Sequence, residues 1–154
     1  VQTNERDYQT ALDIISPLVK VAEDHPFVSD DSVEYISISS RMERALYKHY
    51  FEEFFLEQNP KVRDKIVKVL DIIEQIERVP AQYLKFIEGT NGLFEVRVQL
   101  ASNIFRIFCF FDGNKFVVLL SGFQKKTQKT PHKEIEKAVK LMNEYYKEKE
   151  EDKP

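Results

Sequence analysis

Three apolar segments that follow one another with very short connections constrain the fold more than any other feature of this sequence. In residues 92–100 (GLFEVRVQL), 103–111 (NIFRIFCFF) and 115–123 (KFVVLLSGF) the apolar pattern takes the period of two that is typical of strands. The last two segments are joined through the Asp112-Gly113 step, a strong hairpin signal. These residues therefore predict an antiparallel meander.

Helical patterns flank this meander on both sides. Residues 59–80 (NPKVRDKIVKVLDIIEQIERVP) contain the clearest helix, with Asn59 as its N-cap, Pro60 in its first turn and an apolar stripe at helical spacing. Residues 44–58 are expected to begin as a strand and continue as a helix, and residues 130–146 form a final amphipathic helix. Together these elements predict an α+β fold, in which a small antiparallel β-sheet of three or four strands is flanked by helices.

The chain divides into three segments of unequal character. At 154 residues, 42% of them hydrophobic, it is long enough for one compact core but too short for two full domains. Residues 1–41 have too few large apolar side chains for a core of their own, and we interpret them as an acidic, partly helical N-terminal extension. The folded domain is predicted over residues 42–146, and residues 147–154 are expected to be a charged, flexible tail.

Charge is distributed unevenly between these segments. The formal net charge is −3, but residues 1–41 hold three basic and eight acidic residues, a balance of −5. Residues 85–140 hold ten basic and five acidic residues, a balance of +5. Local charge governs binding to polyanions, so this part of the chain is predicted to face one.

Several functional classes are excluded by what the sequence lacks. The single Cys109 lies between phenylalanines, so no intrachain disulfide forms and a buried thiol is expected. His25, His49 and His132 lack the spacing of metal ligands, and glycine-rich cofactor motifs are missing, so neither metal nor cofactor is expected. Without a membrane-spanning or signal segment, a soluble, cytoplasmic protein is expected.

Two arginines inside the predicted strands are the best candidates for chemistry. Arg106 lies in a segment that is apolar on both faces, and Arg97 alternates with Glu95 and Gln99 on the preceding strand. A guanidinium in such a place is costly unless it is paired or faces a cleft. Three polar side chains emerge at the end of the next strand: Lys125, Lys126 and Gln128. Two interpretations follow, a structural network of Arg97, Glu95 and Arg106, or arginines that bind a phosphate.

The residues that carry these arginines and lysines resemble a known family. The strings GLFEVRVQLASNIFRIFCFF (92–111) and GFQKKTQKTPHKEIEKA (122–138) are similar to the HigB-like branch of the RelE/ParE toxin superfamily, in its phage-derived form. The resemblance covers residues 43–146 in the family's order of elements. It implies a RelE-like fold and the toxin of a type II toxin-antitoxin pair that cleaves mRNA on the ribosome. It also implies neutralisation by a HigA-like antitoxin with a helix-turn-helix.

The resemblance further implies a mechanism and residue roles. Cleavage in this superfamily needs no metal, because the ribose 2′-hydroxyl attacks the adjacent phosphate. The family's catalytic positions correspond to Arg97 and Arg106, which would stabilise the transition state, and to Lys126, which would take part in proton transfer. The implied RNA-binding residues are Lys85, Lys125, Gln128, Lys129 and His132. By its position in the first turn of a helix, His132 also fits an ordinary surface histidine.

Alternatives stay open at this point. A ParE-like inhibitor of gyrase and an inactive interaction module would both use the same fold. The extension over residues 1–41 has no counterpart in the family, although its first part weakly resembles the opening helix of some HigA-type antitoxins. Its negative charge would let it fold over the basic region in cis. Alternatively, its apolar face would pack on the domain or on a second copy, giving a homodimer.

Overall fold

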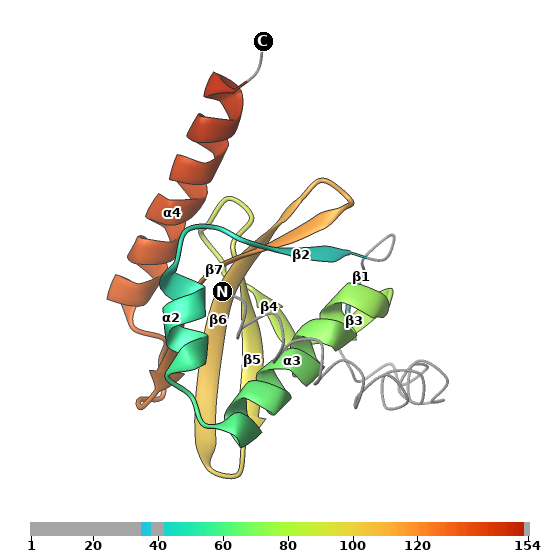
Figure 1. Ribbon diagram of the computed structural model, residues 1–154, viewed down its shortest axis with the longest axis vertical. Coiled ribbons are helices and arrows are strands. Elements are labelled where there is room, and N and C mark those ends of the chain that lie inside the picture. Colours follow the sequence, from blue (N-terminus) through green and yellow to red (C-terminus); the bar gives the residue numbers. More distant parts are fainter. Residues whose placement is uncertain (1–34, 38–41, 153–154) are drawn as a thin grey trace.

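The computed structural model describes residues 35–37 and 42–152 (Figure 1). Over residues 42–152 it contains the helices and strands that the sequence patterns predict, with additional short strands. The elements in chain order are β1 (Tyr35–Ser37), β2 (Glu43–Leu46), α2 (Tyr50–Leu56), α3 (Pro60–Gln75), β3 (Arg78–Pro80), β4 (Leu84–Phe86), β5 (Phe94–Leu100), β6 (Asn103–Asp112), β7 (Phe116–Lys125) and α4 (His132–Glu151). The predicted α+β fold is confirmed.

The main sheet has five strands in the order β2-β7-β6-β5-β4. Strands β4 to β7 form the predicted antiparallel meander, with one short strand added at its edge. Strand β2, however, pairs parallel with β7, from Glu43 opposite Phe116 to Leu46 opposite Leu119. The sheet is therefore mixed, and the prediction of a purely antiparallel sheet of three or four strands is wrong in this respect. A parallel neighbour needs a long connection, which leaves no local signal in the sequence.

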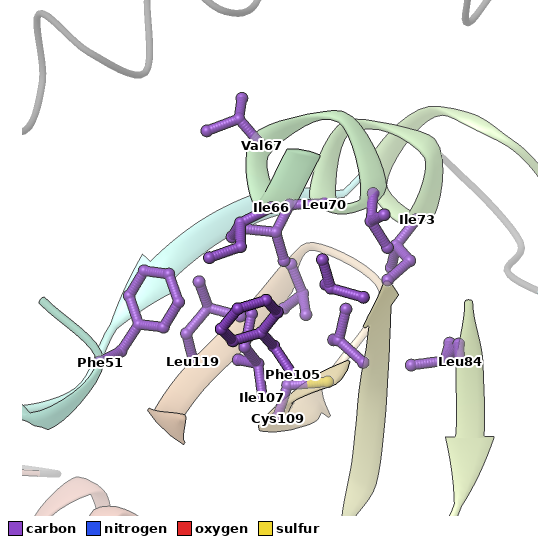
Figure 2. Close-up of a cluster of buried hydrophobic side chains, with 14 of the residues drawn as sticks. Phe51, Ile66, Val67, Leu70, Ile73, Leu84, Phe105, Ile107, Cys109 and Leu119 are labelled. Carbon is purple, nitrogen blue, oxygen red and sulfur yellow. The ribbon is translucent and has the colours of Figure 1, made fainter. Parts of the chain in front are cut away.

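Helices cover both faces of this sheet. The helices α2 and α3 pack against one face, and α4 lies across the other (Figure 1). Figure 2 shows the first of these two layers, where Ile66, Leu70 and Ile73 of α3 lie over Phe105, Ile107 and Cys109 of β6. Cys109 is fully buried, as predicted, and burial raises the pKa of its thiol. Strand β6 is thus the apolar centre of the molecule.

The two long helices begin in different ways. Asn59 caps α3 as predicted, since its Oδ1 accepts a hydrogen bond of 2.9 Å from the N–H of Val62. At α4 no side chain caps the first turn, and the hydroxyl of Thr130 donates to Glu95 Oε2 at 3.3 Å instead. The helix then continues to Glu151. Residues 147–151, predicted to belong to a flexible tail, are therefore helical.

Most of the N-terminal extension lies outside the described residues, including its predicted helix. Within it the structure describes the backbone of β1, which pairs antiparallel with β3. Tyr35 is opposite Pro80 and Ser37 is opposite Arg78. These three residues thus join the end of the extension to the segment between α3 and β4.

The outer part of α4 is held to the sheet by Asp112, the last residue of β6. Its carboxylate accepts hydrogen bonds from the Tyr145 hydroxyl and from Lys149 Nζ, the latter at 2.7 and 2.8 Å. Burial acts to raise the pKa of Asp112, but Lys149 and Tyr145 outweigh it and hold that pKa below its ordinary value. A lowered carboxyl pKa stabilises the fold above the unfolded-state pKa of about 4, and this contribution is lost as the pH falls.

We expect Asp112→Asn to lower the free energy of unfolding by about 1 kcal/mol at pH 7, since Lys149 is half exposed and its pair is screened. Urea denaturation at pH 7 and pH 3 measures this difference, which should shrink at pH 3 because Asp112 is then largely protonated in the unfolded chain. The exposed Asp64→Asn is the control. An equal loss at both pH values would show that the carboxylate charge has no part in the contact.

Candidate nucleic-acid interface

The strand register places the two strand arginines side by side on the α4 face of the sheet. Arg97 is directly opposite Arg106, and Glu95 is opposite Phe108, which packs under α4. The N–H of Arg97 donates to the carbonyl of Tyr83 at 2.8 Å, on the side away from β6. Arg97 and Arg106 therefore form a non-hydrogen-bonded pair, the arrangement in which opposing side chains come closest.

A buried carboxylate lies next to these two like charges. Glu95 is 3% exposed, and its Oε1 lies 3.3 Å from Arg97 Nε and 3.8 Å from Arg106 Nε. Its other oxygen, Oε2, accepts the hydrogen bond from Thr130. One carboxylate therefore compensates two guanidinium groups, and the loop before α4 fixes its orientation.

Further cations surround this trio. Lys85 of β4 is opposite Glu95, and Lys125 of β7 is opposite Ile104, which alternates with Arg106 on the same face. We call Lys85, Arg97, Arg106 and Lys125 the basic cluster. It carries four positive charges around the single negative charge of Glu95, so an excess of positive charge is left for a ligand.

The protonation equilibria of the basic cluster reflect this excess. Burial lowers the pKa of Arg106, Glu95 raises it, and Arg97 lowers it further. Burial likewise lowers the pKa of Lys125, and the neighbouring charges of Arg106, Arg97 and Lys85 add to that effect against the opposing Glu95. Bringing an anion into the cluster would favour the charged forms of both side chains.

The arginines also retain hydrogen-bonding capacity. Arg106 is 8% exposed and donates from Nη1 to its neighbour's carbonyl, Phe105 O, at 3.1 Å. In the described part of the chain the buried Nε atoms of Arg97 and Arg106 lie within ion-pair range of Glu95 but make no hydrogen bond. Buried donors that make no hydrogen bond are costly, so the ion pairs with Glu95 matter for holding both guanidinium groups in place.

An open cavity adjoins these arginines at the free edge of β5. Its volume is about 390 Å³. We call it the edge cavity, and its lining residues are Lys65, Val69, Gln82, Tyr83, Arg97, Val98, Gln99 and Arg106. It forms because β4 pairs with β5 only as far as Val96. The positive charge therefore borders a space that a ligand can enter.

The other predicted site residues lie outside the basic cluster. Lys126, Gln128 and Lys129 are exposed in the loop between β7 and α4. His132 begins α4, where its side chain is 83% exposed and lies 3.0 Å from Glu136. Its position thus matches that of an ordinary surface histidine.

Several residues of the site had not been predicted from the sequence. Lys65, Gln82 and Tyr83 line the edge cavity, and Thr130 holds Glu95. Gln82 and Tyr83 could have been found from the sequence, because they immediately precede the strand that contains Lys85. Lys65 and Thr130 reach the site from separate elements, so no local pattern could have indicated them.

The described residues lack two other kinds of feature, a cluster of metal ligands and a membrane-spanning helix. Within residues 35–37 and 42–152, no three side chains of histidine, cysteine, aspartate or glutamate come together as metal ligands would. Over the same part of the chain, none of the helices combines the length and apolar character that crossing a bilayer requires.

The sequence also matches a described protein family. The family model of phage-derived Gp49-like proteins (DUF891) matches residues 53–143, more than half of the chain. The chain belongs to the Gp49-like family. This toxin-like family is part of the RelE/ParE-like toxin superfamily, which confirms the predicted resemblance at that level. A comparison with curated proteins finds no match. The matched region of this Gp49-like protein contains every residue of the basic cluster.

Proposed function

We propose that this Gp49-like protein is a HigB-like toxin of a type II toxin-antitoxin pair and cleaves mRNA on the ribosome. The observation that carries the proposal is the opposed pair of Arg97 and Arg106. Both arginines share the single counter-charge of Glu95, and both border an open cavity. Planar guanidinium groups in such a place suit a phosphate that gains negative charge in a transition state.

The reaction that fits this arrangement transfers a phosphoryl group within the RNA, from the 5′-oxygen of one nucleotide to the 2′-oxygen of the nucleotide before it. The 2′-oxygen of a ribose attacks the neighbouring phosphorus while its proton passes to a base, and the bond from phosphorus to the 5′-oxygen breaks. The leaving 5′-oxygen takes up a proton, so the products are a cyclic phosphate and a 5′-hydroxyl. Arg97 and Arg106 would stabilise the charge on the phosphate during this step.

Lys125 is better suited than Lys126 to supply the proton. Burial and neighbouring charges lower the pKa of Lys125, and a lower pKa makes an ammonium group a stronger acid. Lys126 and Lys129 lie exposed beyond it, where contacts with the RNA backbone suit them. Gln128 and His132 would border the same RNA path, and Lys85 would bind phosphate from the opposite side.

The proposal also names partners. The substrate would be mRNA on a cytoplasmic ribosome, and a HigA-like helix-turn-helix antitoxin would neutralise the toxin. In the cell, induction of the full chain should stop translation and generate message ends with 5′-hydroxyls on translating ribosomes. A ParE-like action on gyrase would instead produce DNA breaks with intact messages. No growth effect and no message cleavage would mean an inactive interaction module, and either of these last results would overturn the proposal.

A binding measurement tests the lysines at the end of β7. If they hold the RNA backbone, Lys125→Gln/Lys126→Gln should weaken binding to RNA and reduce the salt dependence by about one to two counterions. The measurement is the slope of log affinity against log salt concentration. Lys61→Gln/Lys147→Gln, a pair of exposed lysines elsewhere, is the matched control. An unchanged slope for Lys125→Gln/Lys126→Gln would mean that these two lysines do not contact the RNA backbone.

A further inference from the structure

Resting on the proposed function, we propose that the edge cavity binds the base of a single RNA nucleotide whose phosphate lies against Arg97 and Arg106. It is a specificity site, separate from the charge stabilisation that the arginines provide. Four features of the cavity carry this inference: its position, an aromatic ring in its lining, exposed polar groups, and apolar lining residues.

The position of the cavity links a base site to a phosphate site. Both strand arginines belong to its lining, so a ligand that fills it can reach their guanidinium groups. The volume of about 390 Å³ falls within the usual range of small-molecule sites, roughly 300 to 1,000 Å³. A nucleotide has the corresponding two parts, a flat base and a charged phosphate.

Tyr83 is the aromatic ring of the cavity, and its backbone is held on both sides. Its N–H donates to Pro80 O at 3.0 Å, and its carbonyl accepts from Arg97 N–H at 2.8 Å. The side chain is partly buried and packs against the core under α3. A tyrosine in the lining of a cavity can offer a π-face for base stacking, which tolerates every base.

The rim of the cavity carries groups that can read the edge of a base. The amides of Gln82 and Gln99 are exposed. Gln99 Nε2 donates to Ala101 O at 3.3 Å, which leaves its Oε1 and its second N–H for the edge of a base. The N–H of Arg97 points away from β6, and residues two apart in a strand direct their backbone groups to the same side. The N–H and C=O of Gln99 therefore also point to the free edge of β5. Val69 and Val98 form the apolar floor beneath these groups. This combination distinguishes the cavity from a site for free phosphate, which needs no ring and no floor.

The experiment uses the full chain, labelled with ¹⁵N, and two kinds of probe. The four nucleoside 3′-monophosphates are titrated by NMR alongside ribose 3-phosphate, which lacks the base. We expect the nucleotides to bind about tenfold more tightly than ribose 3-phosphate, a typical effect of stacking one base. The amide signals of Gln82, Tyr83 and Gln99 should shift with nucleotides only.

Two variants of Tyr83 test the ring. Tyr83→Leu keeps an apolar contact with the core but should abolish the tenfold advantage of nucleotides, leaving affinity for ribose 3-phosphate unchanged. Tyr83→Phe keeps the ring and should retain the advantage, and Tyr146→Leu, an exposed tyrosine of α4, is the matched control. Thermal unfolding verifies that each variant is folded, and if Tyr83→Leu is not, the wild-type comparison of nucleotides with ribose 3-phosphate decides. Equal affinity for both probes, or a Tyr83→Leu variant that keeps the advantage, overturns the inference.

The two proposals fail in different ways. Nucleotide binding that depends on Tyr83, without cleavage on ribosomes, would support the base site in the edge cavity and rule out the proposed endonuclease activity. Cleavage of mRNA on ribosomes at unchanged positions by a folded Tyr83→Leu variant would support the endonuclease activity and rule out the proposed base site. Gln99→Met should further reduce the differences in affinity among the four nucleotides, since it replaces the amide with an apolar group of similar length.

Discussion

Arg106→Lys should reduce message cleavage by about 100-fold or more while the protein stays folded. Lysine retains the positive charge but has neither the planar fork nor the Nε donor that lies unused beside Glu95. Loss of one preorganised donor to a developing negative charge typically costs 100-fold to 1,000-fold in rate. The measurement is single-turnover cleavage on programmed ribosomes.

The matched control for this variant is Arg78→Lys, which changes an exposed arginine of β3 outside the basic cluster. Its cleavage rate should equal that of the wild type. Urea denaturation of both variants separates a loss of chemistry from a loss of fold. If Arg106→Lys cleaved at the wild-type rate, Arg106 would have no role in cleavage. It would then belong to a structural network with Arg97 and Glu95, the other interpretation of the sequence.

Glu95→Gln should have the largest effect on stability. The substitution keeps the shape of the side chain but removes the charge that compensates Arg97 and Arg106 at 3.3 and 3.8 Å. Breaking a buried ion pair usually costs about 3 to 5 kcal/mol, and we expect about 3 kcal/mol because Arg97 reaches solvent. Glu53→Gln, an exposed residue of α2, is the control for urea denaturation.

A double variant tests whether the uncompensated charge of Arg106 causes this loss of stability. Glu95→Gln/Arg106→Met removes both partners of one ion pair, so much of the lost stability should return. Cleavage should not return, because the guanidinium is absent. If the double variant were no more stable than Glu95→Gln alone, repulsion around Arg106 would not be the cause of the loss.

Local patterns were sufficient to predict the elements that hold the arginines. The period of two in β5 and β6 placed Arg97 on a polar face of one strand and Arg106 inside the apolar strand that follows it, and the Asn59 cap located the start of α3. These features depend on residues close together in the chain, where side-chain alternation and capping act. Membership of the toxin superfamily followed from the same segments.

Contacts between distant segments could not be predicted in this way. The hydroxyl of Thr130, a residue just before the last helix, donates to Glu95 on a strand 35 residues earlier in the chain. The edge cavity needs Lys65 from α3 next to Tyr83 and Gln99, and its opening depends on where the short β4 ends. Such features are set by how layers pack together, which the pattern of one segment does not contain.

The parallel pairing of β2 with β7 has a consequence for the order in which this protein can fold as it is made. Strand β2 is synthesised early, but its only neighbour in the described sheet is β7, about seventy residues later, and the basic cluster extends to Lys125 at the end of that strand. Such long-range closure is slow and cannot begin before both segments have left the ribosome. A nascent chain ending before Phe116 therefore has neither a complete sheet nor Lys125. If the protein cleaves mRNA on ribosomes as proposed, its own message should therefore not be cut on the ribosome that is still translating it before Lys125 has emerged.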